Sequence, residues 1–250
     1  MTPPIRVVDL ETTGSRPPAH AVCEVGWQDL EIAADGTWQI AETHGAFLID
    51  PQRDIPPVTQ AVHHITDEDV VGAPLWEDAA PSVLRRPGGF TALAAHRAGF
   101  EQRYCTPELT QGARWICTWK CALRLWPDSP GFSNQGLRYW HKPKGLVRER
   151  GLPVHRAFPD AYVSAHLLRD MLALAPVEQL IEWTALPGLL PRMRYGEERG
   201  TSFDELPTAR LKQLAKERDG DVRYTAAWHL EQRGEGALPA PASTAQTELF

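Results

Sequence analysis

Two acidic residues interrupt an apolar, β-branched run close to the start of this chain. Residues 5–10 have the sequence Ile-Arg-Val-Val-Asp-Leu, which is typical of a buried strand. Asp9 and Glu11 are two positions apart, so both side chains lie on one face of that strand. Burial of two carboxylates is costly unless a cation compensates for their charge. The pair therefore indicates either a divalent metal site with oxygen ligands or a strand end that is open to water.

Strand patterns that alternate with helical patterns follow this run. Apolar stretches on either side of Asp35-Gly36-Thr37 predict a β-hairpin. Apolar residues at helical spacing from Phe158 onward predict a helix of several turns, with Pro159 in its first turn. Such an order indicates an α/β domain with a mixed sheet flanked by helices. The predicted strands are 5–10, 21–31, 38–50, 91–95 and 115–118, and the predicted helices lie within 55–71, from 101, over 120–126 and from 158.

The composition changes after Ala175-Pro176. Residues 177–233 contain two or three short helical patterns and predict a small, mostly helical module, for which we assign no role. Residues 234–245 are rich in Gly, Pro, Ala and Ser, which predicts a flexible linker. We therefore divide the chain into a domain of residues 1–176, a C-terminal module of residues 177–233 and a tail of residues 234–250.

Composition and charge exclude several classes of protein. We find no apolar run long enough to span a bilayer and no secretory leader, so we expect a cytoplasmic protein without membrane contact. The formal charge of −6 argues against a passive nucleic-acid coat protein but not against a nuclease whose carboxylates hold cations. For Cys117 and Cys121 we favour core thiols over a zinc site. For His63 we favour a buried histidine that shapes its loop.

Three motifs resemble those of the DEDDh 3′–5′ exonucleases, which have a ribonuclease H-like fold. The first is Val8-Asp9-Leu10-Glu11-Thr12-Thr13-Gly14, and the second is Ala95-His96-Arg97-Ala98-Gly99-Phe100-Glu101. The third is His155-Arg156-Ala157-Phe158-Pro159-Asp160. They stand in the order of that family, over about residues 5–175, and residues 115–127 are most similar to the exodeoxyribonuclease X type. The resemblance implies a ribonuclease H-like, mixed five-stranded sheet.

The resemblance also implies a metal-dependent exonuclease that hydrolyses phosphodiester bonds at DNA 3′ ends in repair or proofreading. Two divalent cations, Mg²⁺ or Mn²⁺, would act on the phosphate. His155 would be the general base on the attacking water, since the ordinary histidine pKa lies near working pH. An exoribonuclease of the same fold is the alternative, as is a weakly active, clamp-associated nucleic-acid-binding protein. The implied metal ligands are Asp9, Glu11, Glu101 and Asp160.

Two residues depart from the family pattern. Glu101 stands where Asp is usual. Either the water ligands of the metal rearrange to fit the extra methylene, or the longer side chain lowers the rate of hydrolysis. Arg97 stands where Asn is usual, and it either contacts a substrate phosphate or pairs with a nearby carboxylate.

The substrate strand is expected along the most basic part of the chain, residues 138–156. Six Lys and Arg residues alternate there with aromatic residues, which suits a single strand, although a solvated basic loop has the same composition. By resemblance, the residues after Glu11 approach the terminal nucleotide. The expected substrate contacts are Thr12, Thr13, Gly14, Arg97, Tyr139, Lys142 and Lys144.

The last five residues, Gln246-Thr247-Glu248-Leu249-Phe250, resemble the peptide by which many bacterial replication and repair proteins bind the DNA polymerase sliding clamp. Leu249 and Phe250 would fill an apolar pocket, and Gln246 would add hydrogen bonds. A meaningless polar tail is the other interpretation. We favour clamp binding because the peptide is terminal and follows a predicted linker.

Overall fold

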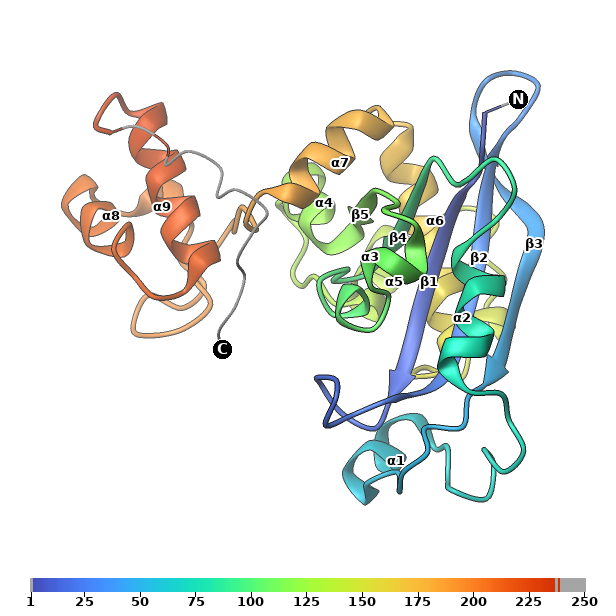
Figure 1. The fold of residues 1–250 in the computed structure, drawn as a ribbon. Coiled ribbons are helices and arrows are strands. Elements are labelled where there is room, and N and C mark those ends of the chain that lie inside the picture. The colour runs from blue at the N-terminus through green and yellow to red at the C-terminus, as the bar shows by residue number, and fades with distance from the viewer. Residues whose placement is uncertain (1, 237, 239–250) are drawn as a thin grey trace.

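A mixed five-stranded sheet forms the centre of the molecule in the computed structural model, which describes residues 2–236 and 238 (Figure 1). The strand order is β3-β2-β1-β4-β5, in which β2 is antiparallel to both β1 and β3, while β4 is parallel to both β1 and β5. The predicted fold class is therefore confirmed. The strands are β1 (Ile5–Thr12), β2 (Val22–Ile32), β3 (Trp38–Leu48), β4 (Ala92–Ala95) and β5 (Trp115–Cys117).

Helices cover both faces of the sheet. One face packs on α4, α5, α6 and α7, and the other packs on α2 with α3 beside it. The helices of this body are α1 (Pro57–His63), α2 (Trp76–Leu84), α3 (Pro107–Thr110), α4 (Thr118–Leu125), α5 (Asn134–His141), α6 (Ala157–Leu172) and α7 (Val177–Ala185), with single 3₁₀ turns η1 (Glu101–Arg103) and η2 (Glu149–Gly151).

The alternation of β1 directs its acids toward α6. Ile5 and Val7 are fully buried in the cluster that includes the α6 side chains, while Val8 and Leu10 pack on the opposite face with α2. Asp9 therefore continues the face of Ile5 and Val7 toward the carboxyl end of the strand, as its spacing predicted.

A glycine on β2 lets the start of α6 reach the sheet. A Cβ atom at Gly26 would lie 2.2 Å from the backbone nitrogen of Phe158. Gly26 is also the residue opposite Asp9 in the β1–β2 pairing. The first turn of α6, in which Pro159 is accommodated as expected, is thereby placed directly over the acidic end of β1.

Most local predictions hold, although α2 and α5 were not predicted and two predicted elements differ in type or bounds. In the hairpin turn, Asp35 Oδ1 accepts hydrogen bonds from Thr37 N (2.9 Å) and Thr37 Oγ1 (2.6 Å). The helix expected from residue 101 is only the 3₁₀ turn η1. Thr118 belongs to α4 rather than to the preceding strand, so β5 ends at Cys117. The second difference lies at an element end, where a pattern defines the bounds least well.

The helix α7 packs on the body that contains the sheet, although it follows the change of composition. Leu180 is fully buried against α4, and Thr184 Oγ1 accepts a hydrogen bond from Cys117 N at 2.7 Å. The predicted division after residue 176 stays a prediction, and these contacts favour a boundary after residue 185.

The buried side chains of the C-terminal module join the core cluster that also contains Trp119 and Leu123 of the body. The module consists of η3 (Phe203–Glu205), α8 (Thr208–Leu214) and α9 (Gly220–Gln232), packed around the fully buried Phe203. Figure 1 shows this module beside the body, on the side opposite β3. Gln246, Leu249 and Phe250 of the predicted clamp-binding peptide lie outside the described residues.

Two structural interpretations from the sequence are confirmed. All four cysteines are buried free thiols, so Cys117 and Cys121 belong to the core. His63 is 2% exposed, and its Nδ1 accepts a hydrogen bond from Ile65 N at 3.1 Å. Among the helices that the structure describes, none is long and apolar enough to cross a membrane.

Candidate active site

Three carboxylates converge at the carboxyl end of β1. Asp9 and Glu11 come from that strand, and Asp160 comes from the first turn of α6. One oxygen from each lies within 4.8 Å of the other two. Oxygen ligands at this spacing suit a divalent cation, whereas three ionised carboxylates without one would repel each other.

Glu101 lies beside this trio as the first residue of η1. It is only 3% exposed, and its Oε2 has no hydrogen-bond partner among the described residues. A buried carboxylate oxygen without a donor is costly. A bound cation would satisfy it, so the four predicted ligands fit a metal centre in both their chemistry and their burial.

Burial and mutual repulsion raise the pKa of these acids. Burial, followed by the charges of Asp160 and Glu24, raises the pKa of Glu11 to about 8. Burial, with a contribution from the Glu11 charge, raises the pKa of Glu101 to about 8 as well. The pKa of Asp9 is raised in the same way, first by burial and then by Glu11. A cation favours the ionised forms and would oppose all three shifts.

Asp160 is held by groups from two elements. Its Oδ2 accepts a hydrogen bond from His155 N (2.8 Å), and its Oδ1 accepts one from Gln135 Nε2 (2.8 Å). Asn134 Nδ2 donates to the Asp160 carbonyl at 3.0 Å. The sequence analysis missed Gln135 and Asn134 because they lie in α5, outside the three motifs, and only tertiary packing brings them here.

His155 occupies the loop that precedes α6. Its backbone is in the left-handed region (φ 59°), and its side chain is exposed and forms no hydrogen bond within the described part of the chain. The ring is close enough to lower the pKa of the Asp160 carboxyl, against the larger raising effect of burial. An exposed imidazole beside the acids is suited to accept a proton from a water molecule there.

The loop after β1 forms a fixed rim of the site. Thr13 Oγ1 accepts from Ala21 N (3.0 Å), and Thr12 Oγ1 donates to the Gly14 carbonyl (2.6 Å). Tyr104, another residue that the sequence analysis missed, donates from its hydroxyl to the same carbonyl at 2.8 Å. Thr12, Thr13 and Gly14 are thus held in place next to Glu11, and their contact with the terminal nucleotide stays a prediction.

Arg97, in the second motif, packs on an aromatic ring. Its guanidinium carbon is 4.4 Å from the centre of the Trp119 ring. It forms no ion pair with the residues that the structure describes. Within the described residues nothing supports the alternative that Arg97 pairs with a carboxylate, and its contact with a substrate phosphate stays a prediction.

The other predicted substrate residues lie away from the acids. The helix α5 runs beside α6 in the same direction, since Asn134 contacts Asp160 and His141 contacts Asp170. At a rise of about 1.5 Å per residue, Tyr139 lies about 7.5 Å and Lys142 about 12 Å beyond Asn134 along α5, and Lys144 follows the end of that helix. Arg138 is buried and donates to the Gly151 carbonyl, so it contributes to packing.

Comparison with known proteins decides the family. A family model described as exonuclease (RNase T) matches residues 7–168, which is more than half of the chain. The chain belongs to this exonuclease family. The predicted family is confirmed, and with it the identity of the chain as a metal-dependent 3′–5′ exonuclease, a hydrolase of phosphodiester bonds.

Individual members of the family are similar over most of their length. Exodeoxyribonuclease 10 of Escherichia coli (strain K12) is 32% identical over 204 residues, which cover 81% of this chain and 84% of that protein. DNA polymerase III subunit epsilon of Treponema pallidum (strain Nichols) is 30% identical over 168 residues, which cover 66% and 74%.

Solved structures agree with the fold. Exonuclease X in complex with 5′ overhanging duplex DNA matches with a TM-score of 0.59 and 30% identity, over 72% of this chain and 99% of that one. E. coli Exonuclease I in complex with a dA16 oligonucleotide has a TM-score of 0.53 at 13% identity, over 73% and 43%, and so shares the fold alone.

Proposed function

We propose that this exonuclease removes nucleotides from DNA 3′ ends, in repair or proofreading, with two divalent cations, Mg²⁺ or Mn²⁺. The observation that carries the proposal is the approach of Asp9, Glu11 and Asp160 to within 4.8 Å beside the buried, unpartnered Glu101 oxygen. The names of the similar proteins, an exodeoxyribonuclease and a DNA polymerase subunit, favour DNA over RNA.

The four carboxylates would hold the cations, which when bound supply positive charge that lowers the pKa of water and stabilises the charge developing on the phosphate. His155 accepts the proton of the attacking water. The water oxygen attacks phosphorus, the bond from phosphorus to the neighbouring 3′ oxygen breaks, and a nucleoside 5′-monophosphate leaves. Gln135 and the His155 amide keep Asp160 in place during this step.

Thr12, Thr13 and Gly14 would contact the terminal nucleotide from the rim of the site, and Arg97 would contact a phosphate further along the strand. Tyr139, Lys142 and Lys144 would contact the nucleic acid only if it extends along α5. We further propose that the protein acts in the cytoplasm.

The direct test is hydrolysis of a 3′-labelled single-stranded DNA by the full chain with Mg²⁺ or Mn²⁺. Cleavage with either metal is expected, and Asp9→Ala should abolish it while leaving the circular dichroism spectrum unchanged. Absence of cleavage with both metals, together with retained clamp binding, would identify a binding protein instead. Faster hydrolysis of an RNA of the same sequence would make RNA the substrate.

We also propose that Gln246, Leu249 and Phe250 bind the sliding clamp. A predicted linker followed by a short peptide with two large apolar side chains supports this. Removal of residues 246–250 should abolish clamp binding in a pull-down without changing activity on short oligonucleotides. Equal clamp binding by the truncated chain would end this part of the proposal.

A further inference from the structure

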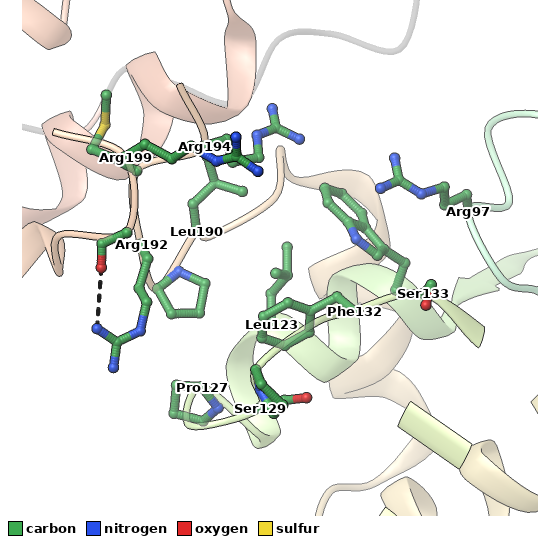
Figure 2. Close-up of a pocket in the computed structure, with 15 residues that line it drawn as sticks. Arg97, Leu123, Pro127, Ser129, Phe132, Ser133, Leu190, Arg192, Arg194 and Arg199 are labelled. Atoms are coloured by element: carbon green, nitrogen blue, oxygen red, sulfur yellow. Dashed lines mark hydrogen bonds between the residues drawn. The ribbon is translucent and has the colours of Figure 1, made fainter. Parts of the chain in front are cut away.

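A pocket of about 400 Å³ lies between the nuclease body and the C-terminal module (Figure 2). The body contributes α4 and the segment that leads to α5, and the module side contributes residues 190–194, 199 and 200. In the described part of the chain, no acidic side chain lines this pocket. Four arginines do, namely Arg97, Arg192, Arg194 and Arg199.

The wall on the body side is fixed by aromatic and histidine contacts. Arg97 lies over the Trp119 ring, which is only 6% exposed. The preceding residue, His96, contacts Thr118 Oγ1 (3.0 Å) through Nδ1 and the Phe132 carbonyl (2.9 Å) through Nε2. These contacts already hold Arg97 at the mouth of the pocket. Binding of a ligand would therefore cost little further side-chain entropy.

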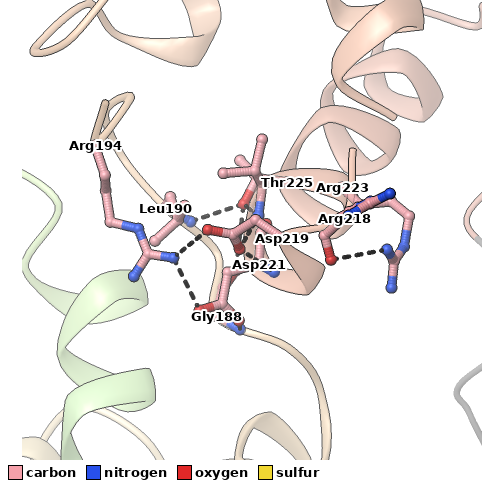
Figure 3. A network of polar contacts seen from close by, with 9 residues as sticks. Gly188, Leu190, Arg194, Arg218, Asp219, Asp221, Arg223 and Thr225 are labelled. Atoms are coloured by element: carbon pink, nitrogen blue, oxygen red, sulfur yellow. Dashed lines mark hydrogen bonds and ion pairs between the residues drawn. The ribbon is translucent and has the colours of Figure 1, made fainter. Parts of the chain in front are cut away.

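The wall on the module side is fixed by a polar network at the start of α9 (Figure 3). Leu190 N donates to Thr225 Oγ1 at 2.9 Å, and Gly188 N donates to Asp221 Oδ1 at 2.7 Å. Arg194 Nη2 donates to Asp219 Oδ2 at 2.9 Å. The segment that carries Arg192 and Arg194 is thus tied to α9 rather than loosely connected.

The positive charge of the pocket is only partly balanced. The carboxylates of Asp219 and Asp221 form ion pairs with Arg194 and neutralise its charge. Within the described ranges, no carboxylate pairs with Arg97, Arg192 or Arg199. Burial, followed by the charge of Arg194, lowers the pKa of Arg97. Guanidinium groups gathered without counter-charges favour the binding of an anion.

Two residues of the body-side wall, Arg97 and Ser133, lie close in sequence to Glu101 and to Gln135, which contacts Asp160. Arg97 precedes Glu101 by four residues, which span at most about 14 Å. Ser133, which lines the pocket, caps α5, and Gln135 in the first turn of that helix donates to Asp160. A strand whose 3′ end reaches the acids therefore has its more distant phosphates within reach of the arginines.

We propose that this pocket binds the phosphate backbone of the nucleic-acid strand a few nucleotides away from the scissile end, and that the C-terminal module thereby extends the substrate site. The inference rests on the proposed nuclease function. Guanidinium groups form paired hydrogen bonds with phosphate oxygens. Phe132, which is partly exposed, supplies apolar surface for a sugar or a base beside the arginines.

The test compares the full chain with its Arg199→Gln variant, whose exposed side chain forms no hydrogen bond with any described residue. Binding of a fluorescent single-stranded DNA of about 16 nucleotides is measured by anisotropy in EDTA, so that no catalysis is needed. We expect the Kd to rise about fivefold to tenfold. We also expect the slope of log K against log salt to fall by about 0.7, which is the loss of one phosphate contact. Arg199→Lys should retain most of the affinity.

Arg218→Gln is the matched control, since it removes an exposed arginine of the module that does not line the pocket. The control should bind like the unmodified chain, and Arg199→Gln should hydrolyse the p-nitrophenyl ester of thymidine 5′-phosphate, which is too small to reach the pocket, at an unchanged rate. Unchanged DNA affinity of Arg199→Gln, or an equal loss in Arg218→Gln, would overturn the proposal. If the unmodified chain hydrolyses neither ester nor DNA, the nuclease function fails, while the anisotropy result still decides whether the pocket binds DNA.

Discussion

Arg156 donates two hydrogen bonds to the carboxylate of Glu24, from Nε at 3.0 Å and from Nη2 at 2.6 Å. Glu24 also accepts a hydrogen bond from Ala157 N at 2.9 Å. One buried acid on β2 therefore fixes the first residues of α6, between His155 and Asp160. Neither residue belongs to the acidic trio, but together they determine where the third motif lies relative to β1.

Replacing Glu24 with Gln should lower both stability and activity. The change weakens a paired, charge-assisted contact worth about 1.5–3 kcal/mol, and the start of α6 loses its anchor. We expect a decrease in unfolding free energy of about 2 kcal/mol and a fall in kcat of about tenfold or more, measured by urea unfolding and by hydrolysis of labelled DNA. The control is Glu178→Gln, which breaks the exposed pair with Arg114 far from the acids and should change neither quantity. Equal kcat values for Glu24→Gln and the unmodified chain would mean that the anchor does not position the site.

Gly26→Ala should push α6 away from the sheet. The new Cβ atom would lie 2.2 Å from Phe158 N and 2.3 Å from the Ala157 carbonyl carbon, and backbone atoms cannot move aside as a flexible side chain can. We expect a loss of about 1–3 kcal/mol in unfolding free energy, which is typical of overpacking, together with reduced kcat. At Gly220 an added Cβ meets only the end of Arg223 at 3.7 Å, so Gly220→Ala should be nearly neutral. A Gly26→Ala protein as stable as the Gly220→Ala protein would contradict this account.

Glu101→Gln should separate activity from stability. Loss of the charge should reduce hydrolysis by about a hundredfold or more, because a ligand of the proposed cations is lost. In EDTA at pH 8 the same change should raise the melting temperature by about 2–4 °C, the effect of about 1 kcal/mol, since it removes a buried acid whose ionisation is unfavourable. Glu101→Asp, with the residue usual in the family, should retain activity with Mg²⁺ or Mn²⁺. Full activity of Glu101→Gln would remove Glu101 from the site.

Stability without metal should decrease as pH rises. The folded-state pKa values of Glu11 and Glu101 are raised to about 8 from 4.5, so the folded protein binds more protons than the unfolded chain between these values. Their contribution is therefore fully present below pH 4.5 and is lost as pH rises to about 8. The melting temperature in EDTA should fall over this range, and Mn²⁺ should reduce the fall, as differential scanning fluorimetry can measure. An identical pH profile with and without Mn²⁺ would argue against cation binding by these acids.

The sequence by itself determined the chemistry of the site and the faces of its main elements. Alternation along β1 placed Asp9 and Glu11 on one side, and helical spacing after Phe158 placed Asp160 at the start of a helix, because both periods are local properties of the backbone. The tertiary structure alone decided which distant residues support them. Gln135, Tyr104 and the Glu24–Arg156 pair carry no local pattern, since a hydrogen bond between separate elements depends on packing and not on spacing. The same reason applies to the pocket. Arg97 and Arg199 are far apart in the sequence and line one pocket only because α7 packs on β5 and the segment after α7 passes Trp119.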